Sequence, residues 1–446
     1  MELVLDLHLH SRFSRAVSPR MNLQNMYIWG RKKGINVLSV TDFTHPVWFK
    51  EACSQLVEKS SGIYTLKSEA DIEAKTQLPN REGSVGMHYI FSTEVAAIYT
   101  ENGKSHRIHN LIFSPNIETC EKINKVFVAR GINLSADGRP ILGISTKQLC
   151  EVLFEIDPKI TVIPCHVWTP WFSLYGSRSG YDTITDCFGK YAPRIFAIET
   201  GISSDPSMNW RIPELNTRSI VSFSDAHSPE KMGREATVLR KKHIANGESR
   251  IATSEITYDN ILNGLVRGKE RVFEMAYTIE YYPEEGKYHF TGHRNCGISY
   301  SPADDKLKGT VCPVCKHELT VGVMHRVEDL AKSSEDNFKL EKDESGVMWV
   351  KDPQNVRPGS VSLVPLLEIL AEVYKTAPNS QKVLTMYDIM TCALGSEHEI
   401  LLRVSLDKIS SLCGSQIAEG VGKVRNRDVA IIPGFDGEYG KVKIWS

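Results

Sequence analysis

Several short segments of this chain end an apolar run with residues that commonly bind metal ions. His8-x-His10 and Asp225-x-His227 each place two such side chains on one face of an extended segment. Imidazole nitrogens and carboxylate oxygens together bind Zn²⁺, Mn²⁺ or Fe²⁺. The full set of candidate ligands is His8, His10, Asp42, His45, Glu94, His109, His166, Asp225 and His227. This set is too large for one tetrahedral ion. We therefore expect a cluster of two or three divalent ions, zinc first, with magnesium or manganese as alternatives.

A cluster of this kind favours hydrolysis of phosphate esters. Bound ions polarise a phosphodiester and lower the pKa of a bound water toward about 7, so hydroxide is available at neutral pH. We expect His8, His10, Glu94 and Asp225 to be the catalytic residues, with Glu94 able to bridge two ions. Asp225 should be the most sensitive position because it joins the last strand to the cluster.

The candidate ligands lie where buried strands should end. About seven short apolar runs occur in residues 1–268, and stretches of helical periodicity at 22–33, 116–130 and 145–155 separate some of them. Apolar strands that alternate with helices indicate a parallel sheet covered on both faces, and here favour a (β/α) barrel. Functional residues of such barrels sit at the carboxyl ends of the strands. Residues 67–86 are polar and are predicted to form an inserted loop.

A second metal motif follows the barrel region. His293-x-x-Cys296 and Cys312-Pro313-Val314-Cys315 form two short knuckles, which is typical of a structural zinc ribbon with a closed tetrahedral site. His289 or His317 could replace His293 as the fourth ligand. The charged surroundings could not build a core without a metal, so we expect one structural zinc here.

The rest of the chain is predicted to be mainly helical. Residues 333–358 are charged and contain Gly and Pro, so they are interpreted as a linker or an exposed excursion. Helices are expected at 364–374, 396–412 and 415–425, before a short strand-like tail. We divide the chain into a metal-dependent phosphoesterase barrel (1–275), a zinc-ribbon domain (276–325) and a mainly helical C-terminal domain (326–446).

Composition limits the other possibilities. The 446 residues carry a net charge of −1, so any nucleic-acid-binding surface must be local. Basic clusters lie at 12–20, 31–33, 240–243 and 267–271, and each could equally be a solvated face. The N-terminus lacks the features of a signal peptide, and no apolar run approaches the roughly 20 residues that cross a bilayer. Ten Cys without a disulfide rhythm favour a cytoplasmic location.

The candidate ligands also carry a family resemblance. Residues 1–268 resemble the polymerase and histidinol phosphatase (PHP) superfamily in Asp6-Leu7-His8-Leu9-His10, Thr41-Asp42, Glu94, His109, His166 and Ser224-Asp225-Ala226-His227. The resemblance implies an α/β fold, a distorted (β/α)7 barrel with a trinuclear site. One ion would take His8, His10, Glu94 and Asp225, and a second would take Glu94, His109 and His166. The third would take His227 with Asp42 or His45, where the chain departs from the usual Thr-Asp-His.

Nearly the whole chain resembles the endonuclease Q family. The resemblance rests on the barrel motifs, His166-Val167-Trp168-Thr169-Pro170-Trp171-Phe172, the zinc ribbon and the tail 433–441. It implies a DNA repair endonuclease that nicks on the 5′ side of deaminated bases (uracil, hypoxanthine, xanthine) and of abasic sites. Its partner would be double- or single-stranded DNA carrying such lesions, with nucleoid association when bound, and no membrane. A replication or repair protein is a further candidate partner.

Six residues are candidates for contact with DNA. Trp168, Trp171 and Phe172 directly follow a predicted ligand, so they could stack on bases or fill the gap left by a flipped nucleotide, or else pack the barrel mouth. Arg178 lies in a polar loop suited to a phosphate contact. Lys423 and Arg425 lie on the last predicted helix, which would either grip DNA, making 326–446 a DNA-binding domain, or simply pack.

Two other functions fit these residues. A PHP-type phosphatase for a small phosphate monoester would use the same barrel, although it would need neither ribbon nor helical tail. A non-catalytic DNA-binding module with a decayed site would share the fold, although nearly every expected ligand is present.

Overall fold

The structure of the chain is a computed structural model that describes residues 2–78, 85–242, 251–268, 271–331 and 338–445. Its central element is a mixed sheet of 13 strands, ordered β15-β16-β17-β12-β11-β1-β2-β5-β4-β3, with β6, β7 and β8 attached through β5 and β6. These strands are β1 (Glu2–Asp6), β2 (Val37–Ser39), β3 (Leu56–Ser60), β4 (Ile63–Leu66), β5 (His88–Glu101), β6 (Lys104–Ser114), β7 (Ile141–Leu142), β8 (Thr161–Pro164), β11 (Ala236–Lys241), β12 (Phe273–Glu280), β15 (Lys339–Lys342), β16 (Met348–Lys351) and β17 (Gly359–Ser362).

The predicted strands of residues 1–268 are present, and a second sheet completes them. β9 (Ala197–Glu199) and β10 (Ser219–Val221) form a parallel pair. Beyond the ends of β1 and β10, an isolated parallel bridge joins Leu9 to Ala226. The segments that carry the first and last predicted ligand motifs therefore lie side by side. The coarse α/β prediction is confirmed, while a seven-stranded barrel stays a prediction.

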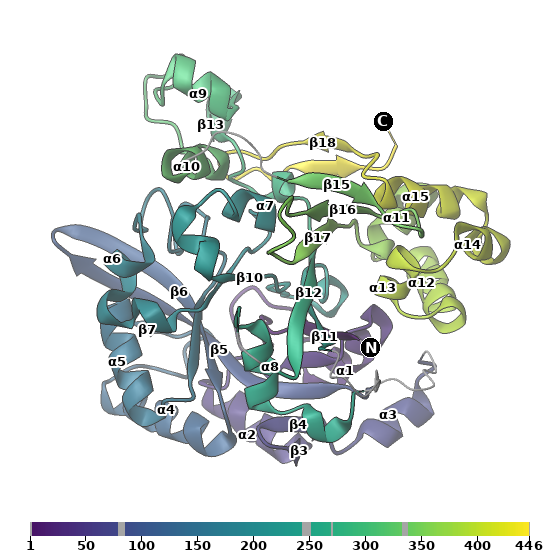
Figure 1. The fold of residues 1–446 in the computed structure, drawn as a ribbon, viewed down its shortest axis with the longest axis horizontal. Coiled ribbons are helices and arrows are strands. Elements are labelled where there is room, and N and C mark those ends of the chain that lie inside the picture. Colours follow the sequence, from purple (N-terminus) through teal and green to yellow (C-terminus); the bar gives the residue numbers. More distant parts are fainter. Residues whose placement is uncertain (1, 79–84, 243–250, 269–270, 332–337, 446) are drawn as a thin grey trace.

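Three predicted helices are confirmed, each by a recognisable start. α1 (Leu23–Lys33), α4 (Ile117–Ala129) and α5 (Thr146–Ile156) begin after Asn22, Asn116 and Ser145, whose side chains accept backbone N–H bonds of the first turn. Other helices of this part are α2 (Pro46–Gln55), α3 (Glu69–Lys75), α6 (Ile184–Phe188), α7 (Pro206–Asn209) and α8 (Tyr258–Leu265). In Figure 1, α4 and α5 lie at the left-hand side of the sheet and the C-terminal helices lie on the right.

The expectation of a purely parallel sheet is wrong. β5 and β6 form a long antiparallel hairpin, β8 pairs antiparallel with β6, and β11 pairs antiparallel with β1. The hairpin turns at Asn102-Gly103, where φ is 51° and 77°. Two consecutive left-handed residues are what a two-residue hairpin turn requires, and Asn-Gly supplies them at low cost. The hairpin places Ala96 of β5 opposite His109 of β6.

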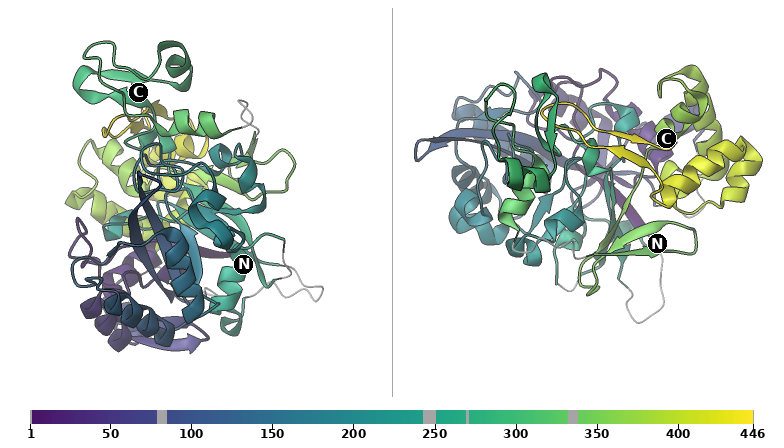
Figure 2. Two further views of the ribbon diagram at one scale, coloured as in Figure 1. Left: turned by 90° about the vertical axis from the view of Figure 1, so that its left-hand side faces the viewer. Right: turned by 90° about the horizontal axis from the view of Figure 1, so that it is seen from above.

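Residues 281–331 form a small module that projects from the top of the molecule (Figures 1 and 2). It contains the antiparallel pair β13 (Thr291–His293) and β14 (Ile298–Tyr300), followed by α9 (Pro302–Lys308) and α10 (Val323–Leu330). Its own apolar cluster is only Tyr300, Cys312 and Leu319, with Cys296, Ile298 and Cys315 packed against it. A core this small needs a further constraint to be stable.

The interpretation of residues 333–358 as a linker is wrong for its described part. β15 and β16 are the outermost strands of the central sheet, and β17 pairs in parallel with β12. The predicted boundary at residue 275 falls inside β12. The sheet therefore continues from the barrel region into the C-terminal region without interruption.

The C-terminal region is mainly helical, as predicted. It comprises α11 (Leu366–Tyr374), α12 (Gln381–Leu394), α13 (Glu397–Leu402), α14 (Leu406–Cys413), α15 (Ser415–Arg425) and the antiparallel pair β18 (Ala430–Ile432) and β19 (Lys441–Lys443). The single helix predicted at 396–412 is two helices, because Ser405 begins a new one by accepting the N–H of Lys408. Among the residues that the structure describes, no helix is long and apolar enough to cross a bilayer.

Candidate metal centre

The first group of ligands lies where three segments of the barrel region meet. His8 and His10 follow β1, Glu94 lies in β5, and Asp225 follows β10. His10 Nε2 lies 3.0 Å from Asp225 Oδ1 and 3.3 Å from Glu94 Oε2. His8 Nε2 lies 3.6 Å from Asp225 Oδ1 and 3.7 Å from Glu94 Oε2. Two nitrogens and two carboxylate oxygens therefore face one small volume.

Each of these two imidazoles is held from behind by a carboxylate. Glu199, at the end of β9, contacts His8 Nδ1 at 2.9 Å. Asp42 contacts His10 Nδ1 at 3.4 Å, and its other oxygen accepts the backbone N–H of Ser11 and the Ser14 hydroxyl. A carboxylate at Nδ1 fixes the tautomer that leaves Nε2 free to bind an ion. Asp42 therefore supports the predicted ligand His10 and is not itself placed to bind the ion.

The second group shares Glu94 with the first. Glu94 Oε1 lies 2.5 Å from His109 Nδ1 and 3.0 Å from His166 Nε2, and these two ring nitrogens are 3.3 Å apart. Since Glu94 Oε2 faces the first group and Oε1 faces the second, this carboxylate is placed to bridge two ions. The groups match the first two sets that the PHP resemblance implied.

The electrostatics favour an ionised Glu94 carboxylate between the two groups. Burial opposes ionisation of Glu94, but the charge of Arg139 and hydrogen bonds from His10 and His109 outweigh it and hold the pKa of Glu94 well below the usual range. Burial lowers the pKa of His109 to about 4, which keeps this imidazole neutral. Asp225 is half-buried, and His8 and His10 keep its pKa below the usual value although burial opposes its ionisation. The neighbouring carboxylates outweigh burial at His8 and His10 and raise the pKa of both imidazoles well above the usual value, so a metal ion would bind there by displacing their protons.

Buried atoms without partners indicate that metal ions fit these groups. Within the described part of the chain, His8 Nε2, His10 Nε2 and Asp225 Oδ1 are buried and have no hydrogen-bond partner. A buried polar atom that makes no bond costs roughly 1–3 kcal/mol, so three of them pointing into one volume need a common partner. A divalent cation satisfies all three at once.

The residues expected at a third ion are less well gathered. His227 lies with His10 and Asp225 in a third candidate group. His45 instead begins α2, where its Nδ1 accepts the N–H of Trp48 at 3.4 Å and its ring stacks on Phe13. We therefore place neither His45 nor Asp42 among the gathered ligands, and a third ion stays a prediction.

The backbone around the ligands is strained. Non-glycine residues with positive φ include Thr41, Asp42, His166, Phe172 and Asp225, which all lie at or next to the ligand groups. Such conformations cost of order 1–3 kcal/mol each and are often kept at functional sites. Gly201 permits the tight packing, because a Cβ on it would lie 2.4 Å from His166 Cβ.

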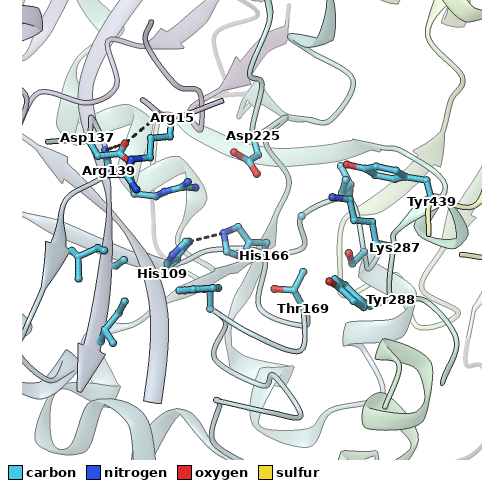
Figure 3. A pocket seen from close by; sticks show the side chains of 17 residues that line it. Arg15, His109, Asp137, Arg139, His166, Thr169, Asp225, Lys287, Tyr288 and Tyr439 are labelled. Carbon is cyan, nitrogen blue, oxygen red and sulfur yellow. Dashed lines mark hydrogen bonds and ion pairs between the residues drawn. The ribbon is translucent and has the colours of Figure 1, made fainter. Parts of the chain in front are cut away.

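A pocket of about 500 Å³ opens over the second group (Figure 3). One wall carries Arg15, Asp137 and Arg139, and the floor carries His109, His166 and Asp225. The opposite wall comes from outside the barrel region, with Lys287 and Tyr288 from the small module and Tyr439 from the C-terminal tail. The volume is typical of sites for small ligands or single groups of a larger one.

The aromatic residues predicted to contact DNA divide into two kinds. Trp168 is buried, and its Nε1 donates to Asn209 Oδ1, so the interpretation of this residue as a base contact is wrong. Phe172 lines the pocket and lies against His109, with ring centroids 4.9 Å apart. Trp171 is half-buried and meets Tyr288 edge to face at 5.6 Å.

The three basic residues predicted to contact DNA all bind other groups of the protein. Arg425 is buried and donates to the carbonyls of Ile400, Leu401, Val404 and Ser345, so its prediction as a DNA contact is wrong. Lys423 pairs with Asp428 at 2.6 Å. Arg178 donates to the Leu319 carbonyl and so ties its loop to the small module.

The four predicted zinc ligands lie together. One ligand atom from each of His293, Cys296, Cys312 and Cys315 lies within 4.8 Å of the others, and His293 Nδ1 is 3.3 Å from Cys315 Sγ. This grouping favours His293 over His289 or His317 as the fourth ligand. Hydrogen bonds from the Cys315 backbone lower the pKa of Cys312 to about 6, which favours the thiolate that zinc requires.

Sequence reasoning missed several residues of the site. Glu199 ends an apolar run in the same way as the predicted ligands, so the signal for it was present. Arg139, whose Nη1 lies 3.1 Å from Glu94 Oε2, sits in a loop without a motif. Lys287, Tyr288 and Tyr439 reach the pocket only through the way the module and the tail pack on the barrel region. Local sequence carries no sign of that.

The fold and the two ligand groups define a metal-dependent hydrolase. Solved structures give a closer comparison. The lesion-specific endonuclease from Pyrococcus furiosus is 26% identical, with a TM-score of 0.75 over 99% of this chain and 95% of that one. An endonuclease Q bound to a 27-mer duplex with an abasic lesion at its active site is 27% identical, with a TM-score of 0.76 over 99% and 96%. The resemblance to the endonuclease Q family is confirmed, and so is the assignment as an enzyme.

Two sequence relatives also match this chain. Protein YqxK of Bacillus subtilis is 26% identical over 98% of this chain and 98% of its own length. Protein MJ0043 of Methanocaldococcus jannaschii is 28% identical over 62% of this chain, and the match spans only 31% of that relative's length. The family model of the MJ0043 C-terminal domain matches residues 365–428, which include α11 to α15.

Proposed function

We propose that this chain is a DNA repair endonuclease that nicks the phosphodiester bond 5′ to deaminated bases (uracil, hypoxanthine, xanthine) and abasic sites. The observation that carries the proposal is that buried Glu94 joins two ligand groups, of which His109, His166 and Asp225 line a pocket. The similarity to an endonuclease Q solved with an abasic duplex supports DNA as the substrate. The location would be the cytoplasm, with the nucleoid when DNA is bound.

The proposed roles follow from the contacts. His8, His10, Glu94 and Asp225 would hold one divalent ion, and Glu94, His109 and His166 a second. Such ions supply Lewis-acid stabilisation of the phosphoryl oxygens and an attacking water of lowered pKa. Glu199 and Asp42 orient the imidazoles. Arg139 lies at the pocket side of Glu94, where its guanidinium can contact a phosphate oxygen of the strand being cut.

The pocket itself would receive the lesion. Phe172 lies on the barrel side, with Tyr288, Tyr439 and Lys287 on the other, so an extruded nucleotide would enter between aromatic walls. Extrusion is easier where pairing is already weak, which gives some selectivity for mismatched or missing bases. Lys287 Nζ lies 4.5 Å from the centre of the Tyr439 ring and adds positive charge for the backbone.

The test is cleavage of duplexes that carry one uracil, one hypoxanthine or one abasic site, each with Mg²⁺, Mn²⁺ or Zn²⁺. We expect nicking 5′ to the lesion, no cut in the undamaged duplex, and loss of activity in Asp225→Asn with the fold retained. Asp259→Asn is the matched control, since Asp259 forms only an exposed ion pair with Lys159. Wild-type rates in Asp225→Asn would show that the site is wrongly assigned.

Two assays separate this proposal from its rivals. Release of phosphate from histidinol phosphate, without nicking of lesion duplexes, would identify a phosphatase. Metal analysis that finds only one ion per chain, in the His293–Cys315 group, would identify a non-catalytic module. The proposal requires ions in both the barrel region and the small module.

A further inference from the structure

A second cavity, of about 840 Å³, lies at the opposite end of the barrel strands from the metal centre. Ser219, the first residue of β10, lines it, whereas Asp225 beyond the end of β10 belongs to the metal centre. Residues in an extended segment rise about 3.3 Å each, so these two positions are separated by roughly 20 Å along the chain. Residues of α8, β12 and β17 border the cavity.

Three arginines line this cavity without a carboxylate partner. Arg267 donates to the carbonyls of Asn216 and Val356, and Arg357 Nη2 donates to Asn216 Oδ1. Arg271 reaches only the Asn263 carbonyl, at 3.4 Å. Among the described residues, none of the three forms an ion pair. The three guanidinium groups therefore donate only to neutral oxygens among the described residues.

The acidic residues of the cavity are already engaged elsewhere. Glu274 binds Arg240 through two nitrogens at 2.9 Å. Asp352 accepts the backbone N–H groups of Gln354, Val356 and Arg357. The remaining cation, Lys351, pairs with Glu341 at 2.7 Å. No described carboxylate therefore forms an ion pair with any of the three guanidinium groups, although the charges of Asp352 and Glu274 offset part of the cost at Arg267 and Arg271.

Burial and mutual repulsion make this arrangement costly. Burial lowers the pKa of Arg267, and the charges of Arg357 and Arg271 lower it further. Burial also lowers the pKa of Arg271, whose Nε is buried without a hydrogen-bond partner in the described part of the chain. A buried donor without an acceptor costs roughly 1–3 kcal/mol, more when charged, so an anion in this space would relieve the cost. Guanidinium groups bind phosphate oxygens through paired N–H bonds.

Aromatic side chains line the other part of the same cavity. The rings of Tyr277 and Trp349 meet edge to face with centroids 4.9 Å apart, and both border the space. Asn355 adds an amide to the lining. We infer that this cavity binds a nucleoside phosphate, its phosphate on Arg267, Arg271 and Arg357 and its base near Trp349. Pockets for such ligands have volumes of about 300–1,000 Å³.

The site is distinct from the proposed cleavage site, so it can be tested with that site disabled. Isothermal titration of the full-length Asp225→Asn protein would use dAMP, pyrophosphate and deoxyadenosine as probes. We expect dAMP to bind most tightly, pyrophosphate more weakly, and deoxyadenosine not measurably, because it lacks the phosphate. Added Arg271→Gln should weaken dAMP binding at least tenfold, whereas Arg240→Gln, whose guanidinium is already paired with Glu274, should leave it within about twofold.

Three outcomes overturn the inference. The first is absence of dAMP binding at millimolar concentration. The second is unchanged dAMP affinity in both Arg271→Gln and Arg357→Gln, each checked for folding by its thermal transition. The third is a lesion-free duplex whose affinity falls in Arg271→Gln while the dAMP affinity does not, which would make this face a contact for the DNA backbone.

Discussion

Replacing Glu199 by Gln should disturb the orientation and tautomer of the His8 imidazole while all predicted metal ligands stay in the chain. The Glu199 carboxylate contacts His8 Nδ1 at 2.9 Å and accepts the backbone N–H of His166 at 2.9 Å. A glutamine has one oxygen and one NH₂ group, so it can accept only one of these two bonds. If its NH₂ group faces His8, then Nδ1 of His8 must accept that N–H. The imidazole proton then lies on Nε2, which is the atom that should bind the ion.

The magnitude follows from the kind of contact that is lost. Outer carboxylates of this sort typically change metal affinity or activity by about 10–100-fold. This corresponds to roughly 1.4–2.7 kcal/mol at one site, since each tenfold change is about 1.4 kcal/mol. The effect should appear in Mn²⁺ affinity by calorimetry and, in parallel, in the nicking rate at limiting metal. Saturating Mn²⁺ should restore part of the rate, because the ligands themselves are intact.

Glu214→Gln is the matched control. Glu214 also ties two segments together, by accepting the Tyr175 hydroxyl at 2.7 Å and the backbone N–H of Ile184, but it touches no predicted ligand. Its replacement should lower stability without changing Mn²⁺ affinity. Equal Mn²⁺ affinities in wild type and Glu199→Gln would refute the reasoning, because His8 would then need no orienting carboxylate.

Three further predictions concern stability. Arg425→Met should lower the free energy of unfolding by about 3 kcal/mol, because several buried carbonyls lose a charged donor. Urea titration would measure this loss. The DNA affinity of the folded protein should stay unchanged. Cys312→Ser should release the zinc of the small module, measured by metal analysis, and lower the thermal transition of that module before the rest. Burial raises the pKa of Glu280 to about 8. Because its proton is held more tightly in the folded state, the stability it gives should fall as pH rises from about 4.5 to 8, by up to about 1.4 kcal/mol per pH unit. Glu280→Gln should make the slope shallower in denaturation measured at several pH values, while Glu235 and Glu285, whose pKa values are also raised, maintain the rest.

The metal ligands could be predicted from the sequence because each one is tied to a local signal. His8, Glu94, His166 and Asp225 each follow a short apolar run in the sequence, and the structure brings these positions together although β5 continues past Glu94 and β8 pairs antiparallel with β6. Helix starts were equally readable, since Asn22 and Ser145 are side chains that cap a first turn. These features depend on a few neighbouring residues only.

The strand directions were harder to predict. An apolar run has the same appearance in a parallel and an antiparallel strand, so the runs at 89–92 and 108–113 gave no sign that they belong to one hairpin. The Asn102-Gly103 pair between them is a strong hairpin signal, and it was overlooked. The linker interpretation of residues 333–358 fails because β15 is exposed along its whole length and therefore carries few apolar residues, which suits the alternative of an exposed excursion.

The roles of the basic residues depended on long-range packing. Arg425 occupies a position on α15 that a helical pattern alone would expose or bury equally well. Only the approach of the 400–404 segment surrounds it with carbonyls. The opposite wall of the pocket consists of Lys287, Tyr288 and Tyr439. It forms only because two segments that are 152 residues apart in the sequence pack against the same side of the pocket.

The shared sheet also constrains how the enzyme can move. β12 leads from the barrel region directly into the segment that carries Lys287 and Tyr288, and β17 anchors the C-terminal helices to that same strand. A hinge between the two regions would have to break the β12–β17 ladder. Both walls of the pocket are therefore attached to the same sheet. We expect a DNA duplex that enters the pocket to bend while the protein keeps its shape.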